Sequence, residues 1–418
     1  MTRTKYRKRF DNPLLKTETL KMHYTWRWFG PEDPVSLADA RQAGATGIVS
    51  ALHHVPNGTV WPLEDIAARK SLIEAAGLRW SVVESIAVPE AIKLGSEGWQ
   101  DLADAWAQSA LNLAQHGITT ICYNFMPILD WTRTRLRHRL ADGAECLRFD
   151  LVDLAAFDLH ILQRPNARLA YGPALLEHAD IRARSLDVTE RVALIDTILA
   201  GLPGSEESYS LEGFRDQIAR YDGLGADGLR RNLAQFLARV IPQIAPHGVK
   251  VALHPDDPPR PIFGLPRVVS TAQDLHAICA MQDDPANGLT FCVGSLGVRA
   301  DNDLPDMLQE FGPRVHFLHL RNTRRDALQA NNTDEIAGES FEEAAHLEGD
   351  ADMVRLIAMI VKLEQTSGRT LPFRPDHGHA LLSDLRQGYR PGYPAIGRLR
   401  GMAEIRGIEH ALVARSMR

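Results

Sequence analysis

Four residues with metal-binding side chains each stand at the end of a short apolar segment. His254 follows VKVAL, Cys292 lies in LTFCVGSLG, His319 ends RVHFLH, and Asp376 follows LPFRP. If these segments are neighbouring parallel strands, their carboxyl ends share one rim and the four side chains converge. Imidazole, thiolate and carboxylate groups bind zinc, iron(II) or manganese. Each residue alone is more often part of a core, but together they predict a catalytic divalent metal site.

The motif HPDDPP, which begins at His254, explains how one of these segments ends. Its three prolines have no backbone N–H group, so they cannot donate to a sheet ladder and the strand must stop there. The histidine is then expected at the mouth of the sheet. Asp256 and Asp257 become available for turn contacts or for hydrogen bonds that orient the metal ligands.

Further polar residues are expected at the same rim. A long segment from Asn322 to Gly349 contains His346, and its length is typical of a lid or binding loop. Cys122, Cys146 and Cys279 have no matching partners and are interpreted as structural. The other polar residues near predicted strand ends are His53, His54, Glu84, Asn124, Arg321, Asn322, Arg374, His377 and Tyr393.

The elements that must position these residues alternate along the chain. Eight segments are apolar on both faces, as buried parallel strands should be: Met22–Phe29, Thr46–Leu52, Leu78–Glu84, Ile118–Asn124, Val249–His254, Leu289–Val293, Arg314–His319 and Leu371–Pro375. Helix-forming segments lie between them, among them Leu63–Ala76, Gln100–His116, Leu229–Ala245 and Ala351–Gln365. The alternation predicts the α/β class and a (β/α)8 TIM barrel.

Residues 125–225 interrupt this pattern as a large insertion after strand four. Thr132–Leu140 alternates, Ala141-Asp142-Gly143 is a turn signal, and Glu145–Leu151 could return as a second strand, so a hairpin followed by helices is expected. One side of the first strand carries a row of arginines, which is either a solvated face or a positive rim that attracts an anionic substrate: Arg133, Arg135, Arg137 and Arg139.

Length and composition bound the possible functions. The chain has 418 residues, 44% hydrophobic and 24% charged, with a net charge of -6 and four cysteines. Residues 1–20 are interpreted as a flexible arm and 21–418 as one barrel domain. The basic N-terminus lacks a following apolar segment, and no apolar run reaches transmembrane length. We therefore expect a cytoplasmic enzyme with no nucleic-acid or membrane partner.

Several long motifs resemble the mannonate dehydratase family. They are RWFGPEDPVSL, ALHHVPNGTVW, HPDDPPRPIFGLPR, NGLTFCVGSLG, HFLHLRN and FRPDHGH with PGY. The resemblance covers nearly the whole chain from about residue 22. It departs from the familiar core in the N-terminal residues, in details of the insertion, and at His379 after Gly378.

The resemblance implies a metal-dependent, xylose-isomerase-like barrel. Its activity would be dehydration of D-mannonate to 2-dehydro-3-deoxy-D-gluconate in hexuronate (glucuronate) catabolism, with Mn2+ or Fe2+. By motif, the metal ligands would be His254, Cys292, His319 and Asp376, and the catalytic pair would be His377 and Tyr393. Barrels of this class are often homo-oligomers, so one is expected here.

The chemistry requires a base for the C2 proton and an acid for the departing C3 hydroxyl. The sequence leaves open which of His377 and Tyr393 has which role. Candidates for binding the substrate carboxylate and hydroxyls are Asn124, Arg321, Asn322 and His346; arginine suits a carboxylate because it donates two parallel hydrogen bonds.

Three other functions remain as alternatives. A sugar isomerase or epimerase would use the same barrel, but such sites are usually rich in Asp and Glu rather than thiolate. A metal-dependent phosphodiesterase of the endonuclease type would need a basic groove, which the net charge disfavours. A non-catalytic sugar-acid-binding barrel would have a closed metal with no open coordination position.

Overall fold

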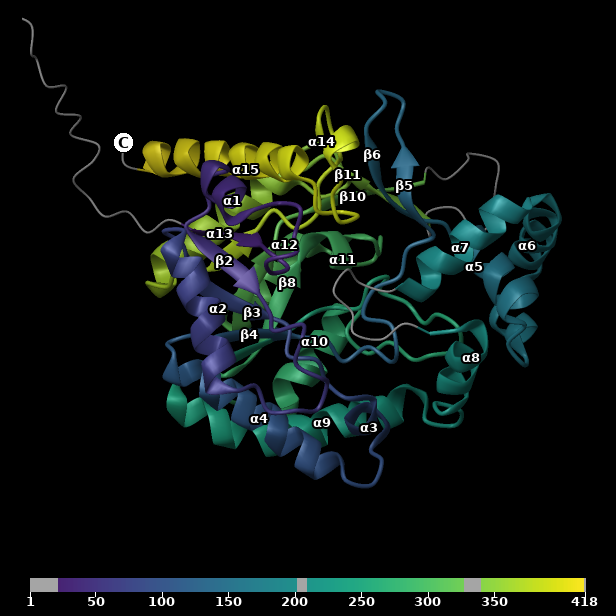
Figure 1. Cartoon of the computed structure of the whole chain (residues 1–418), viewed down its shortest axis with the longest axis horizontal. Coiled ribbons are helices and arrows are strands. Elements are labelled where there is room, and N and C mark those ends of the chain that lie inside the picture. Colours follow the sequence, from purple (N-terminus) through teal and green to yellow (C-terminus); the bar gives the residue numbers. More distant parts are fainter. Residues whose placement is uncertain (1–21, 201–208, 327–339, 417–418) are drawn as a thin grey trace, which may run out of the picture.

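The computed structural model describes residues 22–200, 209–326 and 340–416, and its centre is a closed barrel of parallel strands (Figure 1). Neighbouring strands follow one another in chain order around the barrel. The strands are β1 (His23–Arg27), β2 (Gly47–Ser50), β3 (Arg79–Glu84), β4 (Thr120–Tyr123), β7 (Lys250–Leu253), β8 (Asn287–Cys292), β9 (Val315–His319) and β12 (Pro372–Arg374). All eight predicted strands and the predicted barrel are therefore confirmed.

Helices follow the strands and pack around the outside of the barrel. They are α1 (Leu37–Gln42), α2 (Leu63–Ala75), α4 (Trp99–Gln115), α9 (Gly225–Ile244), α10 (Ala272–Met281), α12 (Leu304–Phe311), α13 (Met353–Ser367) and α15 (Ala395–Ser416). Side chains begin several of them: Ser36 and Thr271 each form a reciprocal capping box with an aspartate three residues later. These caps determine where the helices start after their loops.

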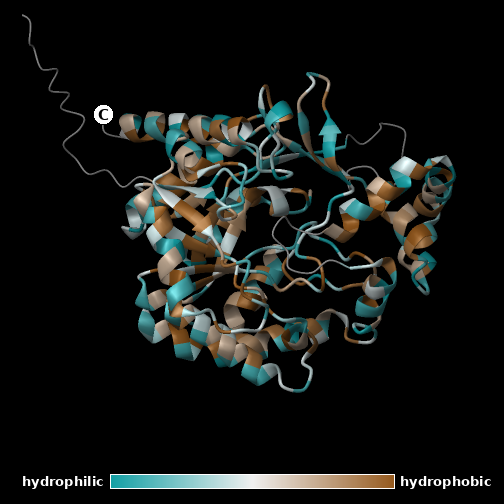
Figure 2. Cartoon of the chain, in the orientation of Figure 1, coloured by the Kyte–Doolittle hydropathy of each residue, from teal (hydrophilic) through white to brown (hydrophobic). Residues whose placement is uncertain are grey.

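The strands are apolar because both of their faces are covered. Every residue of β8 and β9 is buried, as expected for strands between a filled barrel interior and a layer of helices. Val82, Cys122, Ala252 and Phe317 form part of a buried cluster contributed by different strands. The larger core joins residues of the barrel strands and of the helices around them, and Figure 2 shows hydrophobic segments on both.

The insertion begins with the predicted hairpin, formed by β5 (Arg135–Arg139) and β6 (Glu145–Phe149). The hairpin does not stand alone. It belongs to a four-stranded sheet of order β10-β11-β6-β5, whose other strands, β10 (Asn322–Arg325) and β11 (Phe341–Ala344), follow barrel strand β9. The predicted long loop from Asn322 to Gly349 is thus wrong for its described residues; residues 327–339 lie outside the described part.

The rest of the insertion is helical and forms its own core on one side of the barrel (Figure 1). Phe149 of β6 stacks on Phe341 of β11 at 5.5 Å between ring centroids, and Phe263, from the loop after β7, packs edge-on against Phe157 and Phe214. The helical elements are α5 (Leu151–Ala156), a π-helix (Phe157–Leu162), a 3-10 helix (Ala167–Ala170), α6 (Pro173–Ser185), α7 (Val188–Ala200) and α8 (Leu211–Ala219).

None of the helices in the described part combines the length and the apolar character that a bilayer crossing would need. The predicted flexible arm, residues 1–20, lies outside the described residues.

Candidate active site and metal centre

A cavity opens at the carboxyl ends of the barrel strands. Its wall includes His254 after β7, Glu84 at the end of β3, and Asp376 and His377 after β12. Cys292 and His319, at the ends of β8 and β9, are completely buried. The barrel thus brings residues far apart in sequence to one rim, as its topology requires.

The four predicted metal ligands converge. One ligand atom each of His254, Cys292 and His319 lies within 4.8 Å of the other two. Nε2 of His254 is 3.1 Å from Nδ1 of His319, and Oδ2 of Asp376 is 3.7 Å from the same Nδ1 and 3.9 Å from Sγ of Cys292. The three atoms of His254, Cys292 and His319 form a set that could hold one divalent cation, and the carboxylate of Asp376 lies next to two of them.

The hydrogen bonds around the two histidines determine which ring nitrogen could bind a metal. Nδ1 of His254 lies 2.7 Å from the carbonyl oxygen of Pro255; because a carbonyl only accepts, Nδ1 carries the proton and Nε2 presents its lone pair. Nε2 of His319 accepts a hydrogen bond from Nε of Arg374 at 3.1 Å, so the proton of a neutral ring lies on Nδ1, which faces Nε2 of His254. Metal binding through Nδ1 would instead place the proton on Nε2, which lies 3.4 Å from Oε1 of Glu84. Second partners of this kind orient metal-binding imidazoles.

Charge around Cys292 favours its thiolate. Burial by itself raises the pKa of this thiol, but the Arg321 guanidinium and the imidazoles of His254 and His319 outweigh burial, and the pKa lies well below its ordinary value. Sγ also accepts a hydrogen bond from the backbone N–H of Ser295 at 3.4 Å. The thiolate is the form that binds metals.

The loop that carries Asp376 and His377 is held closely against α15. A Cβ atom added to Gly397, in the first turn of α15, would lie 1.9 Å from the carbonyl oxygen of His379, and one added to Gly378 would lie 2.7 Å from Gly397. Asp376 itself has a left-handed backbone, with φ 63°, which is unfavourable for a residue with a side chain. Close backbone packing and ion pairs with Arg321 and Arg374 hold it there.

His377 and Tyr393 lie next to each other in the cavity wall. Their ring centroids are 5.0 Å apart in an edge-to-face arrangement. Nδ1 of His377 is 3.0 Å from Oε1 of Glu343 on β11; since the carboxylate can only accept, Nδ1 donates the hydrogen bond and Nε2 is left for other chemistry. Burial raises the pKa of Tyr393 to about 12, so its phenol keeps its proton at neutral pH.

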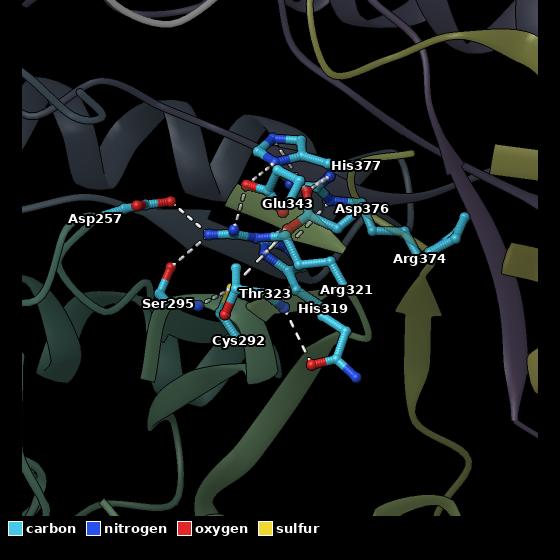
Figure 3. A network of polar contacts seen from close by, with 12 residues as sticks. Asp257, Cys292, Ser295, His319, Arg321, Thr323, Glu343, Arg374, Asp376 and His377 are labelled. Carbon is cyan, nitrogen blue, oxygen red and sulfur yellow. Dashed lines mark hydrogen bonds and ion pairs between the residues drawn. The ribbon is translucent and has the colours of Figure 1, made fainter. Parts of the chain in front are cut away.

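A buried network of charges supports His377 from behind (Figure 3). Arg321 donates to Glu343 at 2.6 Å and to Asp257 at 2.5 Å. Arg133, from the insertion, also donates to both carboxylates, at 2.8 Å and 2.6 Å. Burial alone raises the pKa of Asp257, but Arg133 and Arg321 bring it below its usual value. Because each charge has hydrogen-bonded partners of opposite sign, the network stays ionised although it is buried.

Comparison with known proteins identifies the family. The family model described as D-mannonate dehydratase (UxuA) matches residues 22–418. The chain belongs to the D-mannonate dehydratase family. The mannonate dehydratase of Chromohalobacter salexigens is 52% identical over 94% of this chain and 99% of its own length, and that of Marinomonas sp. is 49% identical over the same shares. The crystal structure of mannonate dehydratase from Streptococcus suis serotype 2 matches at 31% identity with a TM-score of 0.72, covering 95% of both chains.

Within this D-mannonate dehydratase family member, the predicted substrate-binding residues separate into two groups. Asn124 and Arg321 line the cavity. Asn322 and His346 do not: Nδ2 of Asn322 donates to the carbonyl oxygens of His346 and Ala351, and Nε2 of His346 bonds the carbonyl oxygen of Pro375 at 2.7 Å. Both side chains brace backbone next to the site, and this placement does not support their predicted contact with substrate.

The other residues expected at the rim also separate. His53 lines the cavity, whereas His54 is exposed and pairs with Asp65 at 3.0 Å. The predicted arginine row is partly wrong. Arg135, Arg137 and Arg139 alternate outward on β5 as a solvated face, but Arg133 precedes the strand and is completely buried.

Sequence reasoning missed two residues of the dehydratase site. Glu343 lies in a segment that was interpreted as a loop, and its sequence, FEEA, has no apolar–polar alternation that could have indicated a strand. Arg27 ends β1 and lines the cavity; the predicted strand ran on to Phe29, so the strand-end signal that indicated the metal ligands did not point to it. Asp257 was expected to make turn contacts or to orient the metal ligands, and its salt bridges to Arg133 and Arg321 were not expected.

Proposed function

We propose that this protein dehydrates D-mannonate to 2-dehydro-3-deoxy-D-gluconate and water in hexuronate breakdown. The convergence of His254, Cys292, His319 and Asp376 beside the pair His377 and Tyr393 carries the proposal. Family membership over residues 22–418 supports the substrate and the reaction.

The four ligands would hold Mn2+ or Fe2+. A bound divalent cation would neutralise the negative charge that develops on the sugar acid when its C2 proton is removed. The protein prepares for it with a thiolate at Cys292 and a lone pair on Nε2 of His254. A mixed N, S and O donor set is typical of a catalytic ion rather than a closed structural one.

His377 is proposed as the base and Tyr393 as the acid. Glu343 accepts the hydrogen bond from Nδ1 of His377, so Nε2 can take the C2 proton, and the negative charge of Glu343 stabilises the imidazolium that forms. Tyr393 keeps its proton because its pKa is raised to about 12. It can therefore protonate the departing C3 hydroxyl, which is a poor leaving group as hydroxide.

Asn124 is proposed to bind substrate hydroxyls, since it lines the cavity. Arg321 also lines the cavity, but its hydrogen-bond donors are occupied by protein groups and are not available to the substrate. Its Nη1 and Nη2 donate to Glu343, Asp257 and Ser295, and its Nε lies 2.8 Å from Asp376. Its proposed role is to hold Asp376 and Glu343 in position.

The cellular setting is a proposal as well. All four cysteines are free thiols, which is typical of a reducing compartment such as the cytoplasm. The expected homo-oligomer remains a prediction from the barrel class.

The decisive experiment is an assay for 2-keto-3-deoxy acid from a panel of aldonates. Enzyme stripped of metal should be inactive, and added Mn2+ or Fe2+ should restore turnover of D-mannonate above that of its epimers. Formation of an aldose–ketose pair in place of the keto acid would support the isomerase instead. No turnover of any aldonate by metal-loaded enzyme would reject the proposal.

A further inference from the structure

Arg27 is a buried cation in the wall of the active-site cavity. It is the last residue of β1, and only 8% of it is exposed. Its guanidinium lies over the ring of Phe29, 4.6 Å from the centroid, and the same ring meets Tyr393 edge-on at 4.9 Å. Phe29 thus places Arg27 on the side of the cavity where Tyr393 lies.

The other two guanidinium groups of the cavity wall are bound to carboxylates of the protein. Arg374 pairs with Glu84 at 2.8 Å and with Asp376, and its Nε lies against His319. Arg321 pairs with Asp257, Glu343 and Asp376. Nearly all the donors of these two groups are directed at protein atoms, so neither is free to receive an incoming anion.

Arg27 differs from both. Among residues 22–200, 209–326 and 340–416, no acceptor hydrogen-bonds its guanidinium, no carboxylate forms an ion pair with it, and its Nη1 is buried without a partner. Leaving a buried guanidinium without an acceptor costs free energy. Such an arrangement is expected where a ligand supplies the missing acceptor, because the cost is then offset on binding.

The ion pairs among the charged groups of the site leave Arg27 outside them. Three guanidinium groups, Arg133, Arg321 and Arg374, are joined by ion pairs to four carboxylates: Glu84, Asp257, Glu343 and Asp376. Arg27 is the arginine of the described cavity wall that lies outside this paired set. A planar guanidinium offers two parallel donors, which match the two oxygens of a carboxylate.

We propose that Arg27 binds the C1 carboxylate of the sugar acid and so selects an anionic substrate. This inference rests on the proposed function. C1 and C3 of the substrate are separated by one carbon, so a residue beside Tyr393 is within reach of the carboxylate when the phenol is at the C3 hydroxyl. The competing interpretation is that Arg27 only compensates Glu84 through space, in which case its removal would change stability and not ligand selection.

The test uses two unreactive ligands that differ in one charge. A 3-deoxy aldonate lacks the hydroxyl that leaves, and its C1 amide is neutral. Calorimetric titration of both into metal-loaded wild type and Arg27→Gln compares the acid with the amide. We expect the variant to bind the acid about 10- to 100-fold more weakly and the amide with nearly unchanged affinity. Because both proteins contain the metal, its contribution cancels in the comparison.

Arg69→Gln is the matched control. Arg69 donates to Ser50 Oγ and the carbonyl oxygen of Ala51 at the same end of the barrel, but it does not line the cavity. The ratio of the affinities for acid and amide should therefore be the same in Arg69→Gln as in the wild type. If Arg27→Gln does not fold, Arg27→Lys replaces it in the test, because lysine keeps the positive charge but loses the two parallel donors of the guanidinium. We expect the affinity of Arg27→Lys for the acid, but not for the amide, to fall about threefold or more.

An unchanged acid-to-amide ratio in a folded Arg27 variant with full metal content would overturn the proposal, as would equal weakening of both ligands. If the wild type binds neither ligand, that result would instead contradict the proposed function, namely that the substrate is a sugar acid.

Discussion

Nδ1 of His377 lies 3.0 Å from Oε1 of Glu343, a residue that approaches from a strand outside the barrel. Glu343→Gln should therefore lower kcat by about tenfold or more with little change in KM, because the imidazolium loses its anionic partner. The variant should also be less stable by about 3 kcal/mol, since Arg133 and Arg321 lose a buried counter-charge. Steady-state kinetics and denaturant unfolding measure the two effects. Glu342→Gln on the same strand is the control for kcat, and equal kcat values in the two variants would refute the role of Glu343.

A substrate that leaves without a proton should separate the acid from the base. Fluoride departs unaided, so Tyr393→Phe should eliminate HF from 3-deoxy-3-fluoro-D-mannonate at a rate near that of wild type while failing on D-mannonate. His377→Asn should fail on both, since the C2 proton must still be removed. Fluoride release measured with an electrode is the readout. If the His377 variant instead were active on 3-deoxy-3-fluoro-D-mannonate and the Tyr393 variant were not, Tyr393 would be the base and His377 the acid.

Cys292→Ser should lose most of its bound metal, because a hydroxyl is a poor substitute for a thiolate ligand. Elemental analysis after dialysis against dilute metal would show this. Cys279→Ser is a matched control on α10, away from the ligand cluster, and it should keep wild-type metal content. Full metal occupancy in the Cys292 variant would remove sulfur from the site.

Gly397→Ala should impair catalysis from outside the cavity. Its new methyl group would lie 1.9 Å from the carbonyl oxygen of His379, so the loop carrying Asp376 and His377 must shift. We expect kcat/KM to fall about tenfold or more. Gly407→Ala, on the exposed side of the same helix with no atom within 4 Å of the added Cβ, should instead stabilise the protein by about 0.5–1 kcal/mol through helix propensity. Similar kinetics for both alanine variants would contradict the close contact.

Glu364 on α13 should make stability depend on pH. Burial raises its pKa from 4.5 to about 7. Because the folded-state pKa is the higher one, the carboxyl favours folding below pH 4.5, and that contribution is lost as the pH rises through about 7. Glu364→Gln should therefore be more stable than wild type at pH 8.5. The difference in unfolding free energy between variant and wild type should be larger at pH 8.5 than at pH 4.5, by up to about 3 kcal/mol. Chemical unfolding at the two pH values tests this; a pH-independent difference would indicate that the carboxyl does not titrate.

The barrel and its family could be predicted because both depend on local signals. Each barrel strand is a continuous apolar run, and each ligand follows one directly, as Asp376 follows LPFRP. Closure of the barrel then brings the ligands together without further information. The rule did not reach Arg27, because the predicted first strand ended at Phe29 whereas β1 ends at Arg27.

The second sheet could not be predicted in the same way. Phe341 of β11 pairs with Phe149 of β6, almost two hundred residues earlier, and strands of four or five residues have too little periodicity to specify such a partner. As a result Glu343 stayed unnoticed, and Arg133 was grouped with the hairpin's arginine row, which was interpreted as either a solvated face or a positive rim. Asn322 and His346 do lie near the site, as predicted, but their side chains point elsewhere. Side-chain direction depends on tertiary contacts that local sequence patterns do not encode.

The four-stranded sheet joins two excursions of the chain, one after β4 and one after β9, into one shared sheet. Arg133 comes from the first excursion and Glu343 from the second, and both converge behind His377. Neither excursion can therefore be shortened or exchanged alone. A chimera that takes only one excursion from a distant homologue would disrupt the strand pairing and leave a buried charge without its partner. Transplanting both excursions together would preserve the pairing and the ion pairs. Across such homologues the two segments should diverge in concert.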